Sequence, residues 1–134
     1  MNNQHLYLIA LLPPSEVTNQ INNVKQAFSE KYLCYKALHT LPHLTLIPPI
    51  QSDASFETHL LSLKHWIAQQ QTFSISLRNF NFFKNPQHPV VFIDVLKNAQ
   101  LNELYTGLRK QLKRHLPVAA ETPPFHPHFT VGYR

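Results

Sequence analysis

Two short segments of the sequence carry a histidine and a threonine in the same arrangement. Residues 42–46 read Pro-His-Leu-Thr-Leu and residues 127–131 read Pro-His-Phe-Thr-Val, so a shift of 85 residues aligns them. One copy of Pro-His-apolar-Thr-apolar is expected by chance in roughly one chain in a hundred, and two copies in register are much rarer. Imidazole accepts or donates a proton near neutral pH, and a hydroxyl donates to a phosphoryl oxygen without adding charge. The two segments together therefore predict acid–base chemistry on a phosphodiester.

A β-strand at each motif would place its histidine and threonine on one face. Alternate side chains of a strand point to opposite faces, so His43 and Thr45 share a face while the apolar residues between and after them turn to the core. The same holds for His128 and Thr130. Two such strands side by side would bring two imidazoles and two hydroxyls to one spot. One histidine would take a proton from the attacking water or hydroxyl and the other would protonate the leaving oxygen. The symmetry allows either assignment.

The elements that must position these motifs follow from the apolar periodicity. The sequence predicts, in chain order, a buried strand over 6–12, a helix from an N-cap at Ser15 to Tyr32, a strand over 43–47 stopped by Pro48 and Pro49, a helix with its apolar stripe over 56–67, a half-exposed strand over 73–78, a buried strand over 90–96, a helix with its stripe over 101–112, and a strand over 128–133. The order β-α-β-α-β-β-α-β is typical of an α+β or α/β domain.

The sequence also repeats beyond the motifs. The same shift of 85 residues lays Tyr7 and Leu8 on Phe92 and Ile93, so residues 5–50 and 90–134 each read as strand, helix and motif-bearing strand. Two copies related by an approximate two-fold axis would bring the equivalent strands together. No linker divides the chain, so we expect one domain over residues 1–134.

Composition excludes several other function classes. Only 2 Gly and 1 Cys occur in 134 residues, which rules out Gly-rich phosphate loops, disulfides within the chain and Cys-based zinc fingers. The net charge of +5 favours anionic partners such as nucleotides or RNA, although a mildly basic enzyme without a polyanionic ligand explains it equally well. The longest apolar run is too short to span a membrane. The lone thiol and the absence of a targeting segment predict a cytoplasmic location.

At the two motifs the sequence resembles the 2H phosphoesterase superfamily, in particular its 2′-5′ RNA ligase-like branch of RNA cyclic phosphodiesterases. The resemblance covers most of the chain and includes the first apolar strand ending in Leu-Pro-Pro at residues 12–14, both His-x-Thr motifs and the spacing between them. It implies an α+β fold of two pseudo-two-fold-related β-α-β lobes, with mainly antiparallel sheets around a central cleft. It also implies metal-independent attack, without a cofactor, on a 2′,3′-cyclic phosphate or on 2′-5′-linked RNA.

The resemblance also implies roles for individual residues. Carried over by position, His43 and His128 are the catalytic pair, and Thr45 and Thr130 bind the phosphate. The substrate is then an RNA end or a cyclic-phosphate nucleotide, and 2′-5′ ligation or cleavage at the same site stays open beside hydrolysis.

Three further residues are candidates for binding substrate. Relatives usually carry an arginine shortly after the second motif, and Tyr133 and Arg134 occupy that neighbourhood here. Tyr7 offers an aromatic ring that could stack on a base, with core packing as the other interpretation. Relatives also continue past the second motif, so we expect part of the second lobe to be missing and its sheet edge to be open. The chain would then be a monomer, or a dimer formed through that edge.

His126 provides a rival mechanism. Together with His43 and His128 it supplies three imidazoles, enough for an open zinc site that generates a metal-bound hydroxide. Against this, Pro127 disturbs the strand, no carboxylate is placed as an obvious partner for a ligating imidazole, and the two threonines stay unexplained. A third alternative is a non-catalytic RNA-binding module that keeps the same fold.

Overall fold

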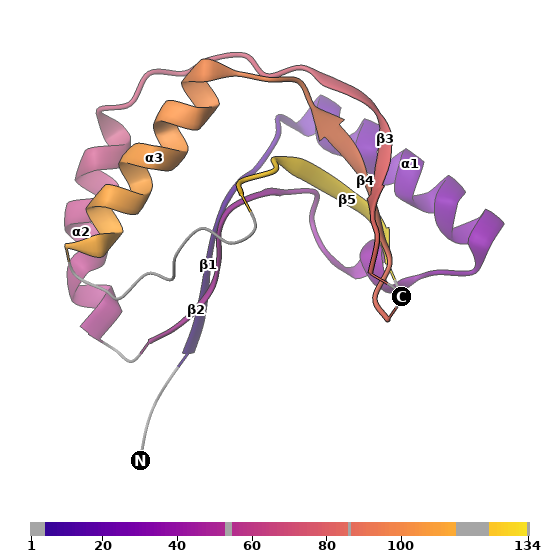
Figure 1. Cartoon of the computed structure of the whole chain (residues 1–134), viewed down its shortest axis with the longest axis horizontal. Helices are drawn as coiled ribbons and strands as arrows, with labels where there is room; N and C mark the ends of the chain where they lie inside the picture. The colour runs from indigo at the N-terminus through magenta and orange to yellow at the C-terminus, as the bar shows by residue number, and fades with distance from the viewer. Residues whose placement is uncertain (1–4, 53–54, 86, 115–123, 134) are drawn as a thin grey trace. The chain divides into compact units, whose positions relative to one another are not determined.

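The computed structural model describes residues 5–52, 55–85, 87–114 and 124–133 (Figure 1). Its elements are β1 (His5–Leu11), α1 (Ser15–Tyr32), the 3₁₀ helix η1 (Lys36–His39), β2 (Leu44–Ser52), α2 (Ser55–Ala68), β3 (Leu77–Phe83), β4 (Val90–Val95), α3 (Ala99–Lys113) and β5 (His128–Tyr133). Apart from the short η1, this is the order that the sequence predicts. None of the helices in these residues is long and apolar enough to cross a membrane.

The five strands form one sheet in the order β1-β2-β5-β4-β3. The pairs β2–β5, β4–β5 and β3–β4 are antiparallel. The α+β class and the antiparallel sheet are therefore confirmed. In the sheet, β2 and β5, which carry the two motifs, are neighbours, so the two motif-bearing strands lie side by side as the sequence predicts.

The chain divides into two compact units, each built from several separate segments of sequence. The first holds α2 and α3 with most of β1 and β2, and the second holds α1, η1, β3, β4, β5 and the start of β2. These units do not coincide with the repeated halves 5–50 and 90–134. The two-fold relation between the halves stays a prediction.

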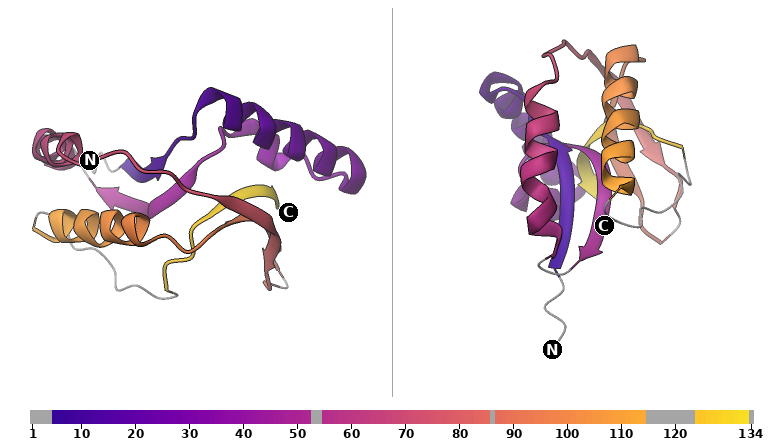
Figure 2. Two further views of the ribbon diagram at one scale, coloured as in Figure 1. Left: turned by 90° about the horizontal axis from the view of Figure 1, so that it is seen from above. Right: turned by 90° about the vertical axis from the view of Figure 1, so that its left-hand side faces the viewer.

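In the first unit, α2 and α3 lie side by side (Figure 2). Gly107 on α3 stands against the Trp66 ring on α2, where an added Cβ would come within 2.7 Å of the indole. The side chain of Asn98 caps α3 by accepting a hydrogen bond from the Leu101 amide (3.0 Å). The apolar stripe of α3 is buried as predicted, through Leu101, Leu108 and Leu112.

In the second unit, α1 packs on β5. Ile21 of α1 is buried, as are Phe129 and Val131 of β5. Gly132 lies directly under Phe28, and a Cβ at this position would overlap the phenyl ring. The ladder with β4 is irregular between the Thr130 and Gly132 pairs, whereas up to Thr130 it is regular, so His128 and Thr130 point to the face opposite the buried Phe129.

Several details of the predicted elements are wrong. The strand expected to be buried over 90–96 is β4, in which Phe92 is buried and the other residues are half-buried, and Leu96 beyond it is exposed.

The strand expected over 73–78 is instead β3, which begins at Leu77. Phe73 and Ile75 are half-buried and alternate with exposed serines as predicted, but the segment is not part of a strand. The Leu96 amide and the Asn98 side chain donate to the Ser76 and Ser74 carbonyls (both 2.8 Å) in place of a regular ladder. The strand over 43–47 does not stop at the prolines but continues to Ser52. Proline keeps an extended φ and removes only a ladder hydrogen bond.

The other two corrections concern the start of the chain. Ser15 is the first residue of α1 rather than its cap, because Pro14 occupies the cap position and no side chain caps the helix there. The first strand is not buried throughout, since Leu6 and Leu8 of β1 are exposed. A strand at the end of a sheet can leave one face open to water, which a continuous apolar run does not reveal.

Candidate functional site

The antiparallel pairing of β2 with β5 brings the two motifs together. Leu44 lies opposite Phe129 in the ladder, and both side chains are buried, with exposed fractions of 0% and 1%. In an antiparallel pair, stepping back along one strand means stepping forward along the other. His43 is therefore opposite Thr130, and Thr45 is opposite His128. The four side chains therefore share the face of the sheet opposite the one that carries the Leu44 and Phe129 side chains.

These four positions form the corners of a small rectangle on the sheet. Directly opposite residues have their Cβ atoms about 5 Å apart, and diagonal neighbours are about 7–8 Å apart. The two histidines occupy one diagonal and the two threonines the other. All four side chains are half-buried, so they are accessible while the apolar residues between them anchor the strands. The structure thus brings together the four residues that the sequence analysis singles out.

Each histidine makes the same hydrogen bond to the backbone. Nδ1 of His43 lies 2.7 Å from the carbonyl oxygen of Leu41, and Nδ1 of His128 lies 2.7 Å from the carbonyl oxygen of His126. A carbonyl oxygen only accepts, so Nδ1 carries the proton in both rings. Nε2 is then the nitrogen that takes up or gives away a proton. Both rings are held in the tautomer that acid–base catalysis by Nε2 requires.

A proline separates each histidine from its acceptor. Pro42 stands between Leu41 and His43, and Pro127 stands between His126 and His128. The fixed φ of proline restricts how the three-residue segment can turn before the strand begins. The repeated Pro-His pair therefore has a structural meaning, since it prepares the same ring orientation twice.

His128 lies against two aromatic rings on its own face of the sheet. The ring of Phe83 is 5.0 Å from the His128 ring, edge to face, and the ring of Phe92 is also 5.0 Å away. Burial lowers the pKa of His128 below its ordinary value, and the charges of His126 and His43 lower it further. The hydrogen bond to the His126 carbonyl and the charge of Asp94 raise it but do not compensate. The neutral imidazole is the favoured form of His128 near pH 7.

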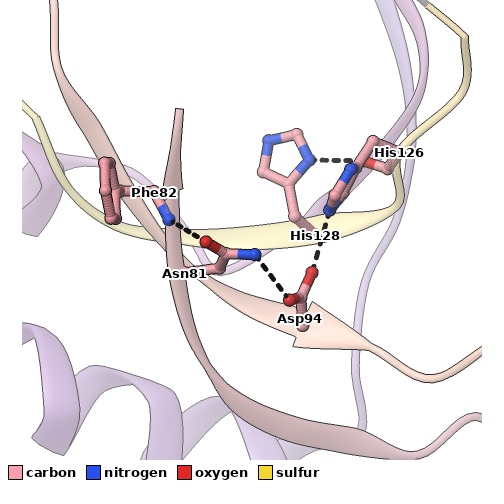
Figure 3. Close-up of polar contacts among 5 residues, drawn as sticks. All are labelled: Asn81, Phe82, Asp94, His126 and His128. Atoms are coloured by element: carbon pink, nitrogen blue, oxygen red, sulfur yellow. Dashed lines mark hydrogen bonds and ion pairs between the residues drawn. The ribbon is translucent and has the colours of Figure 1, made fainter. Parts of the chain in front are cut away.

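Asp94 on β4 is the functional-site residue that the sequence analysis missed. Its Oδ1 lies 2.8 Å from Nε2 of His126, and its Oδ2 accepts a hydrogen bond from Nδ2 of Asn81 at 3.2 Å (Figure 3). The hydrogen bond from His126 is the main reason that the pKa of Asp94 lies below its usual range. The expectation that His126 has no carboxylate partner is wrong. Asp94 is opposite His128 in the β4–β5 ladder, a pairing that sequence spacing alone does not reveal.

The three imidazoles do not form a zinc site. His43, His126, His128 and Asp94 all belong to the described part of the chain, and there no group of three or more His, Cys, Asp or Glu side chains lies close enough to hold a metal ion. Nε2 of His126 is directed at Asp94 instead. The residues present therefore do not fit the zinc mechanism.

The remaining candidates lie in different surroundings. Tyr133 pairs with Val90 on β4 and lines an apolar groove of about 740 Å³, together with Val24 and Phe28 of α1. Tyr7 belongs to the first unit, where its ring stacks on Phe56 at 4.3 Å. Arg134 lies outside the described residues. Substrate binding by these three residues stays a prediction.

A family model for the 2′-5′ RNA ligase superfamily matches residues 13–134, a range that contains both His-x-Thr motifs and Asp94. No curated protein matches the chain.

Proposed function

We propose that this chain, which belongs to the 2′-5′ RNA ligase superfamily and hence to the 2H phosphoesterases, hydrolyses a 2′,3′-cyclic phosphate on an RNA end or a nucleotide without a metal. Membership of this family of phosphodiester-acting enzymes supports the reaction class. The observation that carries the residue roles is the matched pair of hydrogen bonds from Nδ1 of His43 and His128 to backbone carbonyls.

In the proposed reaction, His128 is the general base. Its lowered pKa keeps Nε2 unprotonated near neutral pH, which suits a group that must take a proton from the attacking water. The water oxygen forms a bond to phosphorus as its proton passes to His128. The bond from phosphorus to the ribose O2′ or O3′ breaks on the opposite side.

His43 is then the general acid. It starts protonated and gives its Nε2 proton to the leaving ribose oxygen, so that the histidines exchange protonation states in one turnover. Attack and departure in line place the base and the acid on opposite sides of phosphorus. Two imidazoles on a diagonal of about 7–8 Å leave room for a phosphate between them.

Thr45 and Thr130 occupy the other diagonal of the rectangle. Their hydroxyls are proposed to donate hydrogen bonds to the two non-bridging oxygens of the phosphate, whose charge rises in the transition state. When a 5′-hydroxyl of a second RNA end takes the place of water and the P–O3′ bond breaks, with the proton from His43 passing to O3′, the same step would form a 2′-5′ linkage. Whether water or a 5′-hydroxyl attacks is thus set by which of them is bound beside the phosphate. The two histidines and two threonines play the same roles in both reactions.

The experiment that tests this proposal measures turnover and binding separately. Adenosine 2′,3′-cyclic phosphate and a short RNA with a cyclic-phosphate end are offered to the wild type, His43→Ala and His128→Ala. We expect each variant to lose roughly 10²–10⁴-fold in kcat, the usual contribution of a general acid or base. His88→Ala, an exposed histidine of the same unit, is the matched control and should retain wild-type turnover.

Binding of the same RNA distinguishes the outcomes. Variants that bind it normally without turnover would support a catalytic role for both histidines. Full turnover in either variant would contradict the mechanism. A wild type that binds the RNA but turns over neither substrate would favour a non-catalytic RNA-binding module.

A further inference from the structure

The two catalytic histidines differ in what holds the carbonyl that orients them. His43 donates to the carbonyl of Leu41, whose side chain is exposed and apolar. His128 donates to the carbonyl of His126, a residue whose ring is itself fixed by a carboxylate. The residue that orients His128 is therefore itself held by a carboxylate, a contact that Leu41 does not have.

These contacts form a continuous chain between neighbouring strands. Asn81 on β3 accepts a hydrogen bond from the Phe82 amide (2.8 Å) through its side-chain oxygen and donates to Asp94 Oδ2 through its amide nitrogen (3.2 Å). Asp94 Oδ1 contacts His126 Nε2 at 2.8 Å, and the His126 carbonyl accepts from His128 Nδ1 at 2.7 Å. Figure 3 shows the whole chain on one face of the sheet.

We infer that Asp94 and His126 are positioning residues for His128, holding its imidazole in the orientation and tautomer needed for proton transfer at Nε2. The carboxylate fixes the ring of His126 and thereby the backbone of that residue, whose carbonyl is the acceptor for His128. The inference rests on the proposed function of His128 as the general base. Neither residue touches the reacting atoms in this scheme.

Asp94 and His126 also affect the pKa of His128 through their charges. The titratable groups that act on His128 come from three places: His126 just before its own strand, Asp94 on β4, and His43 at the start of β2. The neighbours from β3, Asn81 and Phe83, are uncharged. The charge of Asp94 raises the pKa of His128, whereas a charge on His126 lowers it. Removing the charge of Asp94 should therefore move the His128 titration to lower pH, and removing the His126 imidazole should move it to higher pH.

The experiment follows the His128 ring by NMR in the full chain without substrate. Asp94→Asn keeps the size of the side chain and removes the charge, so the His128 titration should move to lower pH. His126→Gln keeps a donor for Asp94 and removes the imidazole, so the titration should move to higher pH. Glu30→Gln, an exposed carboxylate change on α1, is the charge-matched control and should leave the titration unchanged.

Turnover provides the second measurement. The acidic limb of the kcat/KM–pH profile, which reports the free enzyme, should shift in the same direction as the His128 titration in each variant. Asp94→Asn should lower kcat at neutral pH by roughly tenfold, the effect of losing one charge-assisted hydrogen bond, with KM little changed.

Three outcomes decide the inference. Opposite shifts in the two variants support it. A His128 titration unaffected by both substitutions would overturn it, even if kcat falls, because a merely structural role changes stability without this signature. If Asp94→Asn does not fold, the direction of the shift in His126→Gln decides alone. Absence of turnover in the wild type would contradict the proposed function, and the titration shifts would still report whether the pair positions His128.

Discussion

The surroundings of the two motifs differ more than their sequences do. Before His43, the segment from η1 to Thr40 is held by Lys25 of α1, a lysine with an exposed fraction of only 2%. Its Nζ donates to the carbonyl oxygens of Ala37 (3.0 Å) and Thr40 (2.9 Å). Before His128, the corresponding support is a carboxylate on a neighbouring strand that holds an imidazole.

The same orientation of a histidine ring is therefore stabilised in two ways. Before the first motif the buried ammonium group of Lys25 binds main-chain carbonyls, and before the second motif Asp94 binds the ring of His126. Both histidines keep the same hydrogen bond to a carbonyl two residues earlier. The likeness of the motifs therefore concerns the orientation of the two imidazole rings, whereas the surroundings of the rings differ, as the proposed separate roles of base and acid require.

The largest effect should come from comparing the two histidines on substrates that differ in leaving group. A 4-nitrophenolate leaves without protonation, so an enzyme that lacks its general acid should recover turnover on a 4-nitrophenyl phosphodiester. We expect His43→Ala to regain most of a roughly 10²–10⁴-fold loss in kcat on this substrate, and His128→Ala to regain little. Release of 4-nitrophenolate, followed by absorbance, gives the measurement. The reverse pattern would exchange the two roles.

The next effect concerns Lys25, whose hydrogen bonds hold the segment before the first motif. Lys25→Met keeps most of the buried stem and removes the donor, so the Thr40 carbonyl loses its bond from Nζ and the Ala37 carbonyl keeps the longer bond from the Thr40 hydroxyl (3.3 Å). We expect the free energy of unfolding to fall by about 1–3 kcal/mol, measured by urea denaturation. Lys36→Met, an exposed lysine on η1, is the matched control and should change the unfolding free energy little. Equal stability of Lys25→Met and the wild type would show that these hydrogen bonds are not needed.

A smaller effect is expected in the pH dependence of the wild type. A general base works when deprotonated, so kcat/KM, which reports the free enzyme, should rise with pH through the pKa of His128. Burial lowers that pKa, so the midpoint of the acidic limb should lie below 6.5, the ordinary value for histidine. At higher pH, loss of the proton from the general acid should lower kcat/KM and give a bell-shaped profile. An acidic midpoint above that value would be inconsistent with His128 as the base.

Chelation should have the smallest effect. Because the imidazoles near Asp94 are not grouped as metal ligands, turnover should be the same before and after dialysis against EDTA. The measurement is kcat on the cyclic-phosphate nucleotide, with added zinc as the comparison. Loss of turnover on dialysis and its recovery with zinc would contradict the metal-independent mechanism.

The order of elements and the four motif residues could be predicted from the sequence because both depend on local patterns. Apolar periodicity located α1, α2 and α3, and the repeated Pro-His-x-Thr predicted that the two histidines and two threonines share one face. Asp94 and Lys25 could not be found in this way. Each acts through a partner far away in sequence, His126 for one and Ala37 with Thr40 for the other, and no local pattern encodes such a contact.

The boundaries of strands were also beyond the sequence pattern. The alternation of Phe73 and Ile75 with serines correctly reports which side chains are half-buried, but a strand also needs a regular ladder, and beyond Val95 the neighbouring chain gives the Ser76 carbonyl one amide donor, Leu96, before α3 begins. At Pro48 and Pro49 the pattern suggests a stop, whereas the extended backbone continues to Ser52. Strand length depends on the neighbours in the sheet, which become known only with the tertiary structure.

The pairing of Leu44 with Phe129 has a consequence for how the protein is made. The two residues are separated by most of the chain, so the ladder that joins the motifs is a contact of very high sequence separation. Such contacts form slowly, because a long loop must close before any interaction compensates for its entropy. During synthesis, helix α1 can form early, but the two histidines cannot meet until residue 129 has left the ribosome. A nascent chain therefore has no assembled site, and the phosphodiester chemistry becomes available only as a late event of folding.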